Sequence, residues 1–156
     1  MSEDTAIRAK AVSQLVERYS LFDDRILIIG CGNGAELYAI RQSGRRQLTV
    51  LEDDPEAAFR MQRLWPEFER PIDFQLGNLD HLLHKLPANN FALVLIQERQ
   101  PEARLVARLS NNIIVIVDND PTPYRKVGYR ELCSQMPLPD GRSASIFQRP
   151  LGMQQT

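Results

Sequence analysis

The sequence predicts a single α/β domain, a doubly wound three-layer sandwich whose mostly parallel sheet ends in an antiparallel β-hairpin. Three observations predict this class. Continuous apolar, largely β-branched runs at 26–29, 91–96 and 113–117 are typical of strands buried on both faces of a parallel sheet. Segments of helical composition separate these runs, and right-handed crossovers place such helices on both faces. After a Pro- and Gly-rich turn, the alternating pattern of 143–148 predicts the hairpin.

Composition narrows the functional classes. The chain has 156 residues, a net charge of −1 and 25% charged residues, so no electrostatic footprint indicates a nucleic-acid or anionic membrane partner. Cys31 and Cys133 make neither a disulfide framework nor a metal site. No apolar run approaches the length of a membrane span, and the first residues lack signal-peptide character. We therefore expect a cytoplasmic protein.

The chain begins with a predicted amphipathic helix over about residues 4–20. Val12, Leu15, Val16 and Tyr19 recur there at helical spacing. We expect this helix to cover one face of the sheet, and a lid over a ligand site is the alternative.

A glycine-rich turn follows the first strand. Residues 26–29 lead into Gly30-Cys31-Gly32-Asn33-Gly34, and residues 35–42 have helix-forming composition. Three glycines at alternate positions leave the inner surface of the turn without side chains. A ligand can therefore press against backbone N–H groups at the start of the helix.

The second strand, Leu48–Leu51, ends in Glu52. In a βαβ unit, the tip of the second strand lies beside the glycine turn of the first, where a carboxylate accepts both hydroxyls of a ribose. Gly30, Gly32 and Ala35 also satisfy the dinucleotide pattern G-x-G-x-x-G/A, so a nicotinamide site stays open as an alternative.

The later strands also end in polar residues. A short third strand over 72–76 leads into Gly77–Asp80, the fourth strand ends at Gln97-Glu98, and the fifth ends at 118–120. A helix is expected over about 101–109, followed by a turn at Asn111-Asn112. The carboxyl ends of these strands would line one edge of the sheet, which is where ligands bind in open α/β sheets.

In their order and spacing, these motifs resemble the class I S-adenosylmethionine-dependent methyltransferases, a Rossmann-like family, over about residues 24–149. The resemblance is closest to small O-methyltransferases. It rests on Ile-Leu-Ile-Ile-Gly-Cys-Gly-Asn-Gly, on Leu-Glu-Asp-Asp-Pro, on Leu-Gly-Asn-Leu-Asp and on the hairpin Pro-Leu-Pro-Asp-Gly-Arg-Ser-Ala-Ser-Ile. Dinucleotide-binding domains lack that hairpin as a rule. The expected single domain, 1–156, has a lead helix at about 4–20, a βαβ core at about 24–120 and a hairpin at about 131–149.

The resemblance implies S-adenosyl-L-methionine as the cofactor. The glycine turn would lie against the amino-acid end of the cofactor, and Glu52 would bind its ribose. Asp53 would pack near the adenine, and Asn78 and Leu79 would contact the adenine edge. Gln97 would face the reacting methyl. The expected contacts are Gly30, Cys31, Gly32, Asn33, Gly34, Glu52, Asp53, Asn78, Leu79 and Gln97. Methyl transfer needs mainly the positioning of the acceptor, so no catalytic side chain is assigned.

Two departures from the family bear on the chemistry. Ile28 stands where the family usually has an acid, two residues before the first glycine. Asp118-Asn119 looks like the pair that metal-dependent O-methyltransferases use, but Gln97 replaces their other acid, so no metal is assigned. A divalent site completed by Glu98 or Asp120 stays open as an alternative. His81 and His84 share a helix face without an evident third ligand.

The chain also lacks the inserted cap with which most members hold their acceptor. Either the acceptor is large and brings its own surface, or a homodimer or partner subunit closes the site, or the chain has lost activity. The acceptor itself is expected to be a small molecule or a protein. Three alternatives to a methyltransferase remain: a non-catalytic member that serves as a binding or interaction module, an NAD(H)-binding Rossmann domain, and an aminopropyl transferase similar to the polyamine synthases, which share the fold.

Overall fold

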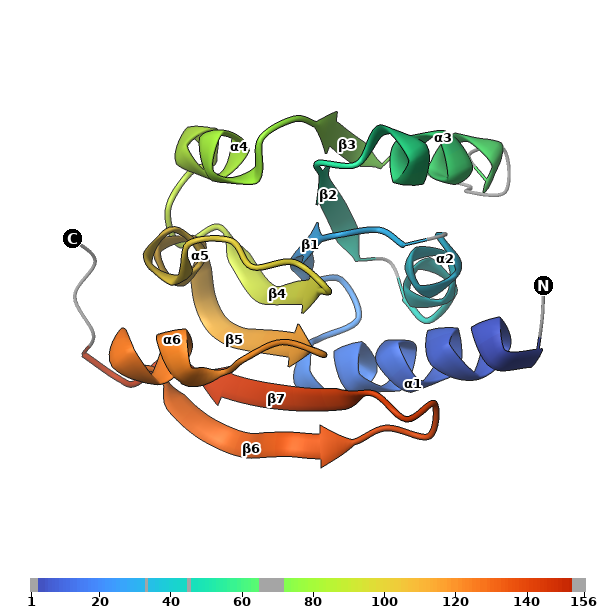
Figure 1. Ribbon diagram of the computed structural model, residues 1–156. Helices are drawn as coiled ribbons and strands as arrows, with labels where there is room; N and C mark the ends of the chain where they lie inside the picture. Colours follow the sequence, from blue (N-terminus) through green and yellow to red (C-terminus); the bar gives the residue numbers. More distant parts are fainter. Residues whose placement is uncertain (1–2, 33, 45, 65–71, 153–156) are drawn as a thin grey trace.

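The computed structural model describes residues 3–32, 34–44, 46–64 and 72–152, which form one seven-stranded sheet with helices on both faces (Figure 1). The strands are β1 (Arg25–Ile29), β2 (Gln47–Glu52), β3 (Asp73–Leu76), β4 (Phe91–Gln97), β5 (Ser110–Val117), β6 (Arg130–Pro137) and β7 (Ser143–Gln148). The helices are α1 (Glu3–Tyr19), α2 (Ala35–Gln42), α3 (Pro55–Leu64), α4 (Leu79–Lys85), α5 (Ala103–Leu109) and α6 (Thr122–Lys126).

The sheet order is β3-β2-β1-β4-β5-β7-β6. Strands β1 to β5 are parallel, whereas β7 pairs antiparallel with both β5 and β6. The strand order reverses between β1 and β4, because the chain builds β1, β2 and β3 outward on one side and then returns to the other. In open α/β sheets, the crevice at the carboxyl ends of the strands beside such a reversal is the usual ligand site.

Two hydrophobic cores lie on opposite faces of the sheet. Helices α1, α2 and α3 cover one face and α4, α5 and α6 cover the other (Figure 1). Within β1, Ile26 and Ile28 belong to the first core, and Leu27 and Ile29 to the second. Successive strand residues point to opposite faces, so burial on both sides explains the continuous apolar run that predicted this strand.

The predicted fold class and the terminal hairpin are confirmed, and one local prediction is wrong. The predicted turn at Asn111-Asn112 lies within β5, because Ser110 already pairs with Phe91 of β4. A short helix, α6, follows the fifth strand, where the residue pattern indicates no element. Pro123 lies in its first turn, where a missing N–H costs nothing.

The lead helix packs as a cover over the sheet: Val12, Leu15 and Val16 of α1 lie in the first core.

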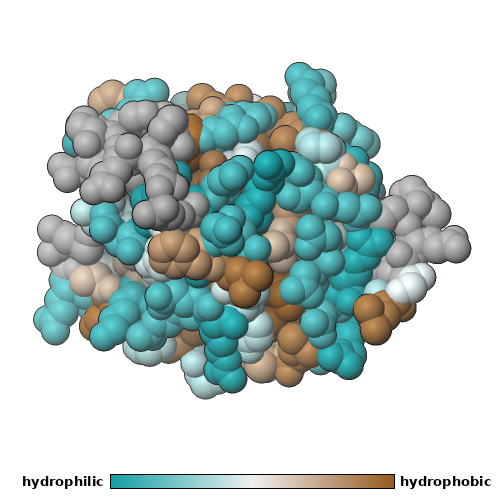
Figure 2. Space-filling model, turned by 180° about the vertical axis from the view of Figure 1, so that it is seen from behind, coloured by the Kyte–Doolittle hydropathy of each residue, from teal (hydrophilic) through white to brown (hydrophobic). Residues whose placement is uncertain are grey.

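None of the helices within the described ranges is long and apolar enough to cross a membrane. Figure 2 shows the face opposite to that of Figure 1, where hydrophobic side chains are scattered among hydrophilic ones.

Candidate functional site

The glycine turn between β1 and α2 is held against the tip of β4. Gly30 has φ +87°, and a Cβ built on it would lie 2.5 Å from the backbone oxygen of Gln97. Only glycine fits there, because both the backbone conformation and the close approach exclude a side chain. The nearest atom to a Cβ built on Gly32 is Glu36 Oε2, at 3.7 Å. The loop is therefore tight at Gly30 and bare at Gly32, and Asn33 lies outside the described residues.

Glu52 points its carboxylate at this turn and is fully buried. Its Oε1 accepts hydrogen bonds from the backbone N–H of Cys31, at 3.0 Å, and from the Cys31 thiol, at 3.4 Å. Its Oε2 accepts from the N–H groups of Asp53, at 2.8 Å, and Asp54, at 3.1 Å. Burial alone would raise the pKa of Glu52, but the hydrogen bonds from Cys31, Asp54 and Arg99 lower it to about 2. The carboxylate is therefore ionised near neutral pH.

Arg99, just beyond β4, covers this carboxylate. Its Nη2 lies 2.9 Å from Glu52 Oε2 and its Nε lies 2.8 Å from Asp53 Oδ1. The loop that carries Arg99 is itself held, because the Arg99 backbone oxygen accepts a hydrogen bond from the side-chain amide of Asn119. A ligand hydroxyl can therefore take the outer side of the Glu52 carboxylate only when the Arg99 guanidinium moves aside.

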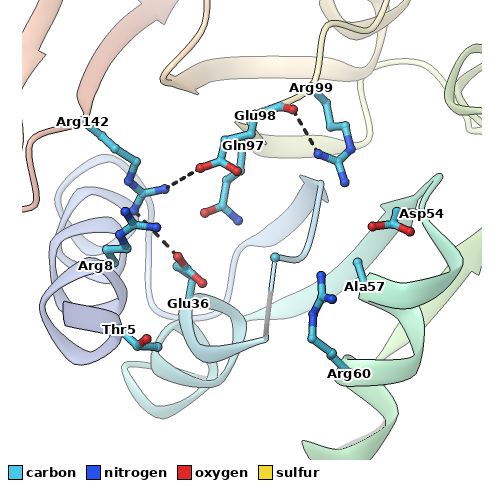
Figure 3. Close-up of a pocket in the computed structure, with 11 residues that line it drawn as sticks. Thr5, Arg8, Glu36, Asp54, Ala57, Arg60, Gln97, Glu98, Arg99 and Arg142 are labelled. Atoms are coloured by element: carbon cyan, nitrogen blue, oxygen red, sulfur yellow. Dashed lines mark hydrogen bonds and ion pairs between the residues drawn. The ribbon is translucent and has the colours of Figure 1, made fainter. Parts of the chain in front are cut away.

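A cavity of about 420 Å³ opens over the turn at the carboxyl edge of the sheet. Figure 3 shows two groups of lining side chains, with Gln97 and Glu98 between them. We call the first group the Arg99 end; it consists of Asp54, Ala57, Arg60 and Arg99. We call the second group the Arg142 end; it consists of Thr5, Arg8, Glu36 and Arg142. Gly32 also lines the cavity, so the bare part of the turn faces the ligand space.

The Arg142 end is strongly charged and buried. Arg142 is 8% exposed, and its Nε donates a hydrogen bond to Asp140 Oδ2 at 2.7 Å. Its Nη1 lies 3.8 Å from Glu98 and its Nη2 lies 3.7 Å from Glu36. Nη2 has no hydrogen-bond partner among the described residues. Burial raises the pKa of Glu36, and Arg142 opposes that rise.

The structure brings four of the predicted contact residues together. Cys31 and Glu52 are joined by the hydrogen bonds described above, and the buried Gln97 donates from Nε2 to the backbone oxygen of Gly30 at 3.0 Å. Burial, followed by the charge of Glu52, raises the pKa of Cys31 to about 12, so this residue carries a neutral thiol near neutral pH. Gly34, with φ 89°, directly precedes α2.

The other predicted contacts have structural roles that are visible without a ligand. Asp53 pairs with Arg99. The side-chain oxygen of Asn78 caps α4 by accepting from the N–H of His81 at 3.0 Å. Leu79 is buried in the core of that face. Their contact with a cofactor stays a prediction.

Sequence reasoning missed most of the charged residues that line the cavity: Arg8, Glu36, Arg60, Arg99 and Arg142. Two of them had a usable signal, since Glu36 lies in the first turn after the glycine loop and Arg99 lies two residues beyond the β4 tip. Arg142 gave none, because its place depends on how the hairpin folds back. Among the described residues, no group of three or more His, Cys, Asp and Glu side chains could hold a metal ion.

Comparison with known proteins places the architecture. No family model matches the chain, and no curated protein sequence matches it. Among solved structures, a methyltransferase dependent on S-adenosylmethionine from Aquifex aeolicus matches with a TM-score of 0.69 at 10% identity, over 95% of this chain and 99% of the other. An RNA methyltransferase from Salinibacter ruber, in complex with S-adenosylhomocysteine, matches with a TM-score of 0.65 at 16% identity, over 94% and 95%. The chain has the class I methyltransferase fold.

This methyltransferase fold does not by itself fix an activity. The [4+2]-cyclase SpnF matches with a TM-score of 0.70 at 13% identity, over 90% of this chain and 80% of its own. The function must therefore be argued from the residues of the cavity.

Proposed function

We propose that the chain binds S-adenosylmethionine and transfers its methyl group to an acceptor. The observation that carries the proposal is the Glu52 carboxylate, which is ionised, buried and fixed at the glycine turn by four N–H and S–H donors. A carboxylate at the tip of the second strand, beside a turn at the strand-order reversal, is the arrangement that binds ribose hydroxyls.

The opposite end of the cavity fits the rest of such a ligand. Arg142 aims into it a buried Nη2 that has no hydrogen-bond partner within the described ranges, and Glu36 adds a buried carboxylate. An orphaned buried donor indicates a missing partner. The cofactor would supply an activated methyl group on its sulfonium. The chain would hold the nucleoside end and the amino-acid end of the cofactor. Gln97 lies between the two ends of the cavity and is bonded to Gly30, so it would fix the distance between them.

A dinucleotide fits this cavity less well. In NAD(H)-binding domains, the pyrophosphate lies at the N-terminus of the helix that follows the glycine turn. Here that position carries the buried Glu36, whose Oε2 lies near Gly32. A carboxylate would repel a pyrophosphate there, since the two anions would share a poorly hydrated site.

For the acceptor, we propose an oxygen atom on a small molecule or a protein, supported by the resemblance of the terminal hairpin to that of small O-methyltransferases. Methyl transfer would then depend on aligning the acceptor oxygen with the methyl group rather than on an acid/base pair. A second copy of the chain or a partner subunit would close the open side of the cavity.

A non-catalytic interaction module is the second candidate, and Arg99 favours it. Its guanidinium is bonded to Glu52 and Asp53, so it fills the place where a ribose would bind. A chain that has lost the cofactor would keep such an internal pair, because the pair satisfies the buried carboxylate.

Calorimetric titration with S-adenosylhomocysteine separates these candidates. The proposal expects binding by the wild-type chain and a loss of at least tenfold in affinity for Glu52→Gln, since a neutral amide binds two ribose hydroxyls less well. Glu131→Gln is the matched control, because Glu131 also pairs with an arginine but lies on the edge strand β6 and does not line the cavity. No binding at millimolar ligand would exclude the methyltransferase and favour the interaction module. Greater thermal stabilisation by NADH would select the dinucleotide alternative.

A further inference from the structure

We infer that Arg142 binds the carboxylate of the cofactor's amino-acid end and that Glu36 binds its ammonium group. This assignment rests on the proposed function and deepens it. It makes the turn between β6 and β7 part of the cofactor site, far in sequence from the glycine turn.

Arg142 is held so that one edge of its guanidinium stays available. Asp140 accepts hydrogen bonds from both the backbone N–H of Arg142, at 3.0 Å, and its Nε, at 2.7 Å. The two Nη groups then face the cavity, between Glu36 and Glu98 (Figure 3). A guanidinium edge of two parallel N–H donors matches the two oxygens of a carboxylate.

The bonds that the Nη groups make within the chain are incomplete. The distances of 3.7 Å from Nη2 to Glu36 and 3.8 Å from Nη1 to Glu98 exceed ordinary hydrogen-bond lengths. Nη2 is buried and without a hydrogen-bond partner in the described part of the chain. Leaving a buried charged donor unsatisfied is costly, so this atom is better explained by a ligand oxygen than by the fold alone.

The charges at this end select a zwitterion. Arg8, whose Nε lies 3.8 Å from Asp140, adds a second guanidinium beside Arg142. Glu36 and Glu98 approach from the other sides. A phosphate or a simple carboxylate would gain the arginines but would also meet two carboxylates. An α-amino acid group places its own ammonium beside the glutamates, so every charge finds an opposite partner.

The test compares two ligands that share the nucleoside and the thioether. S-adenosylhomocysteine has the amino-acid end, and 5′-methylthioadenosine lacks it. Calorimetry on the full chain should give tighter binding of S-adenosylhomocysteine by at least tenfold. Arg142→Gln should weaken S-adenosylhomocysteine by about 10- to 100-fold, the range for losing charge-assisted hydrogen bonds, and should change 5′-methylthioadenosine less than about twofold. Glu36→Gln should also reduce the preference between the two ligands.

Arg130→Gln is the matched control, because Arg130 lies on the same hairpin but is exposed and bonded to Gln148. It should leave both affinities unchanged. The ratio of the two affinities guards against misfolding, since a damaged fold would weaken both ligands together. Equal weakening of both ligands by Arg142→Gln, or an unchanged affinity for S-adenosylhomocysteine, would overturn the assignment. Failure of the wild-type chain to bind either ligand would instead refute the proposed function on which the assignment rests.

Discussion

Removing the Arg99 side chain should increase the affinity for an adenosine-containing ligand. In the structure, the guanidinium of Arg99 occupies the outer side of the Glu52 carboxylate. A ribose that binds Glu52 must first displace it, so the apparent dissociation constant is the intrinsic one divided by the fraction of molecules in which Arg99 has moved. Arg99→Ala abolishes the competition and leaves Glu52 with its bonds from Cys31, Asp53 and Asp54.

The size of the effect follows from the two contacts of Arg99. Its bond to the buried Glu52 is charge-assisted, and such bonds contribute about 1.5–3 kcal/mol. Its pair with Asp53, whose side chain is 44% exposed, is worth well under about 1 kcal/mol. Displacing Arg99 therefore costs about 2 kcal/mol, which is a factor of about 30 in affinity. We expect Arg99→Ala to bind S-adenosylhomocysteine about 10 to 30 times more tightly than the wild type.

Calorimetric titration at constant pH and ionic strength measures this difference. Arg125→Ala is the control, since Arg125 also pairs with a glutamate, Glu131, at 2.9 Å, but on the surface away from the cavity. Its affinity should equal that of the wild type. Thermal denaturation without ligand should find Arg99→Ala less stable than the wild type, because Glu52 loses one donor.

A weaker ligand affinity in Arg99→Ala would refute this reasoning. Arg99 would then be a binding residue that stays in place beside the ligand rather than a competitor for Glu52. Equal affinity would mean that Arg99 already lies away from the carboxylate in solution.

Three further outcomes are expected. Gly30→Ala should destabilise the chain by about 1–3 kcal/mol more than Gly141→Ala in urea denaturation: both glycines have φ +87°, but a Cβ meets the Gln97 oxygen at 2.5 Å only at Gly30. Because the folded-state pKa of Glu52 is lowered to about 2, its ionised form contributes stability that is complete above about pH 5 and is lost as the pH falls toward 2. Glu52→Gln should flatten that part of the stability curve, and an unchanged slope would contradict the assignment. Burial raises the pKa of Glu36 in the folded chain above its unfolded value, because the fold disfavours the charged carboxylate. The free energy of unfolding therefore falls as the pH rises from the unfolded pKa through the raised folded pKa. Glu36→Gln should therefore unfold at a higher temperature than the wild type at pH 7, while Glu3→Gln on the exposed start of α1 should not.

The sequence predicts the fold well because each element carries its own local signal. The run at Ile26–Ile29 is apolar throughout since alternate residues serve two different cores. Glycine at position 30 follows from the turn itself, and the hairpin follows from alternation around a Pro- and Gly-rich turn. The elements that the sequence misses are those with weak local signals: α6 has five residues, and the first residues of β5 are polar.

The site is predicted only in part, and the reason is the range of its contacts. Glu52 is found from its strand-tip position, which the βαβ unit determines. Arg99 meets Glu52 across 47 positions in the sequence, so only the folded sheet brings these two side chains together. Asn78 shows a second limit: its position suggests a ligand contact, and the folded chain also uses its side-chain oxygen to cap α4. Its contact with a cofactor stays a prediction.

The two ends of the cavity differ in what a ligand must displace before it can bind. At the Arg99 end, a bond between charged groups must break before the nucleoside can reach Glu52. At the Arg142 end, a donor is already available, and none of the described residues competes for it with good hydrogen-bond geometry. An amino-acid group can therefore bind before Arg99 moves, and its binding energy can offset the cost of that movement. A bare nucleoside lacks this contribution and bears the whole cost, so the same pair of arginines would make the cavity selective for a ligand that has both ends.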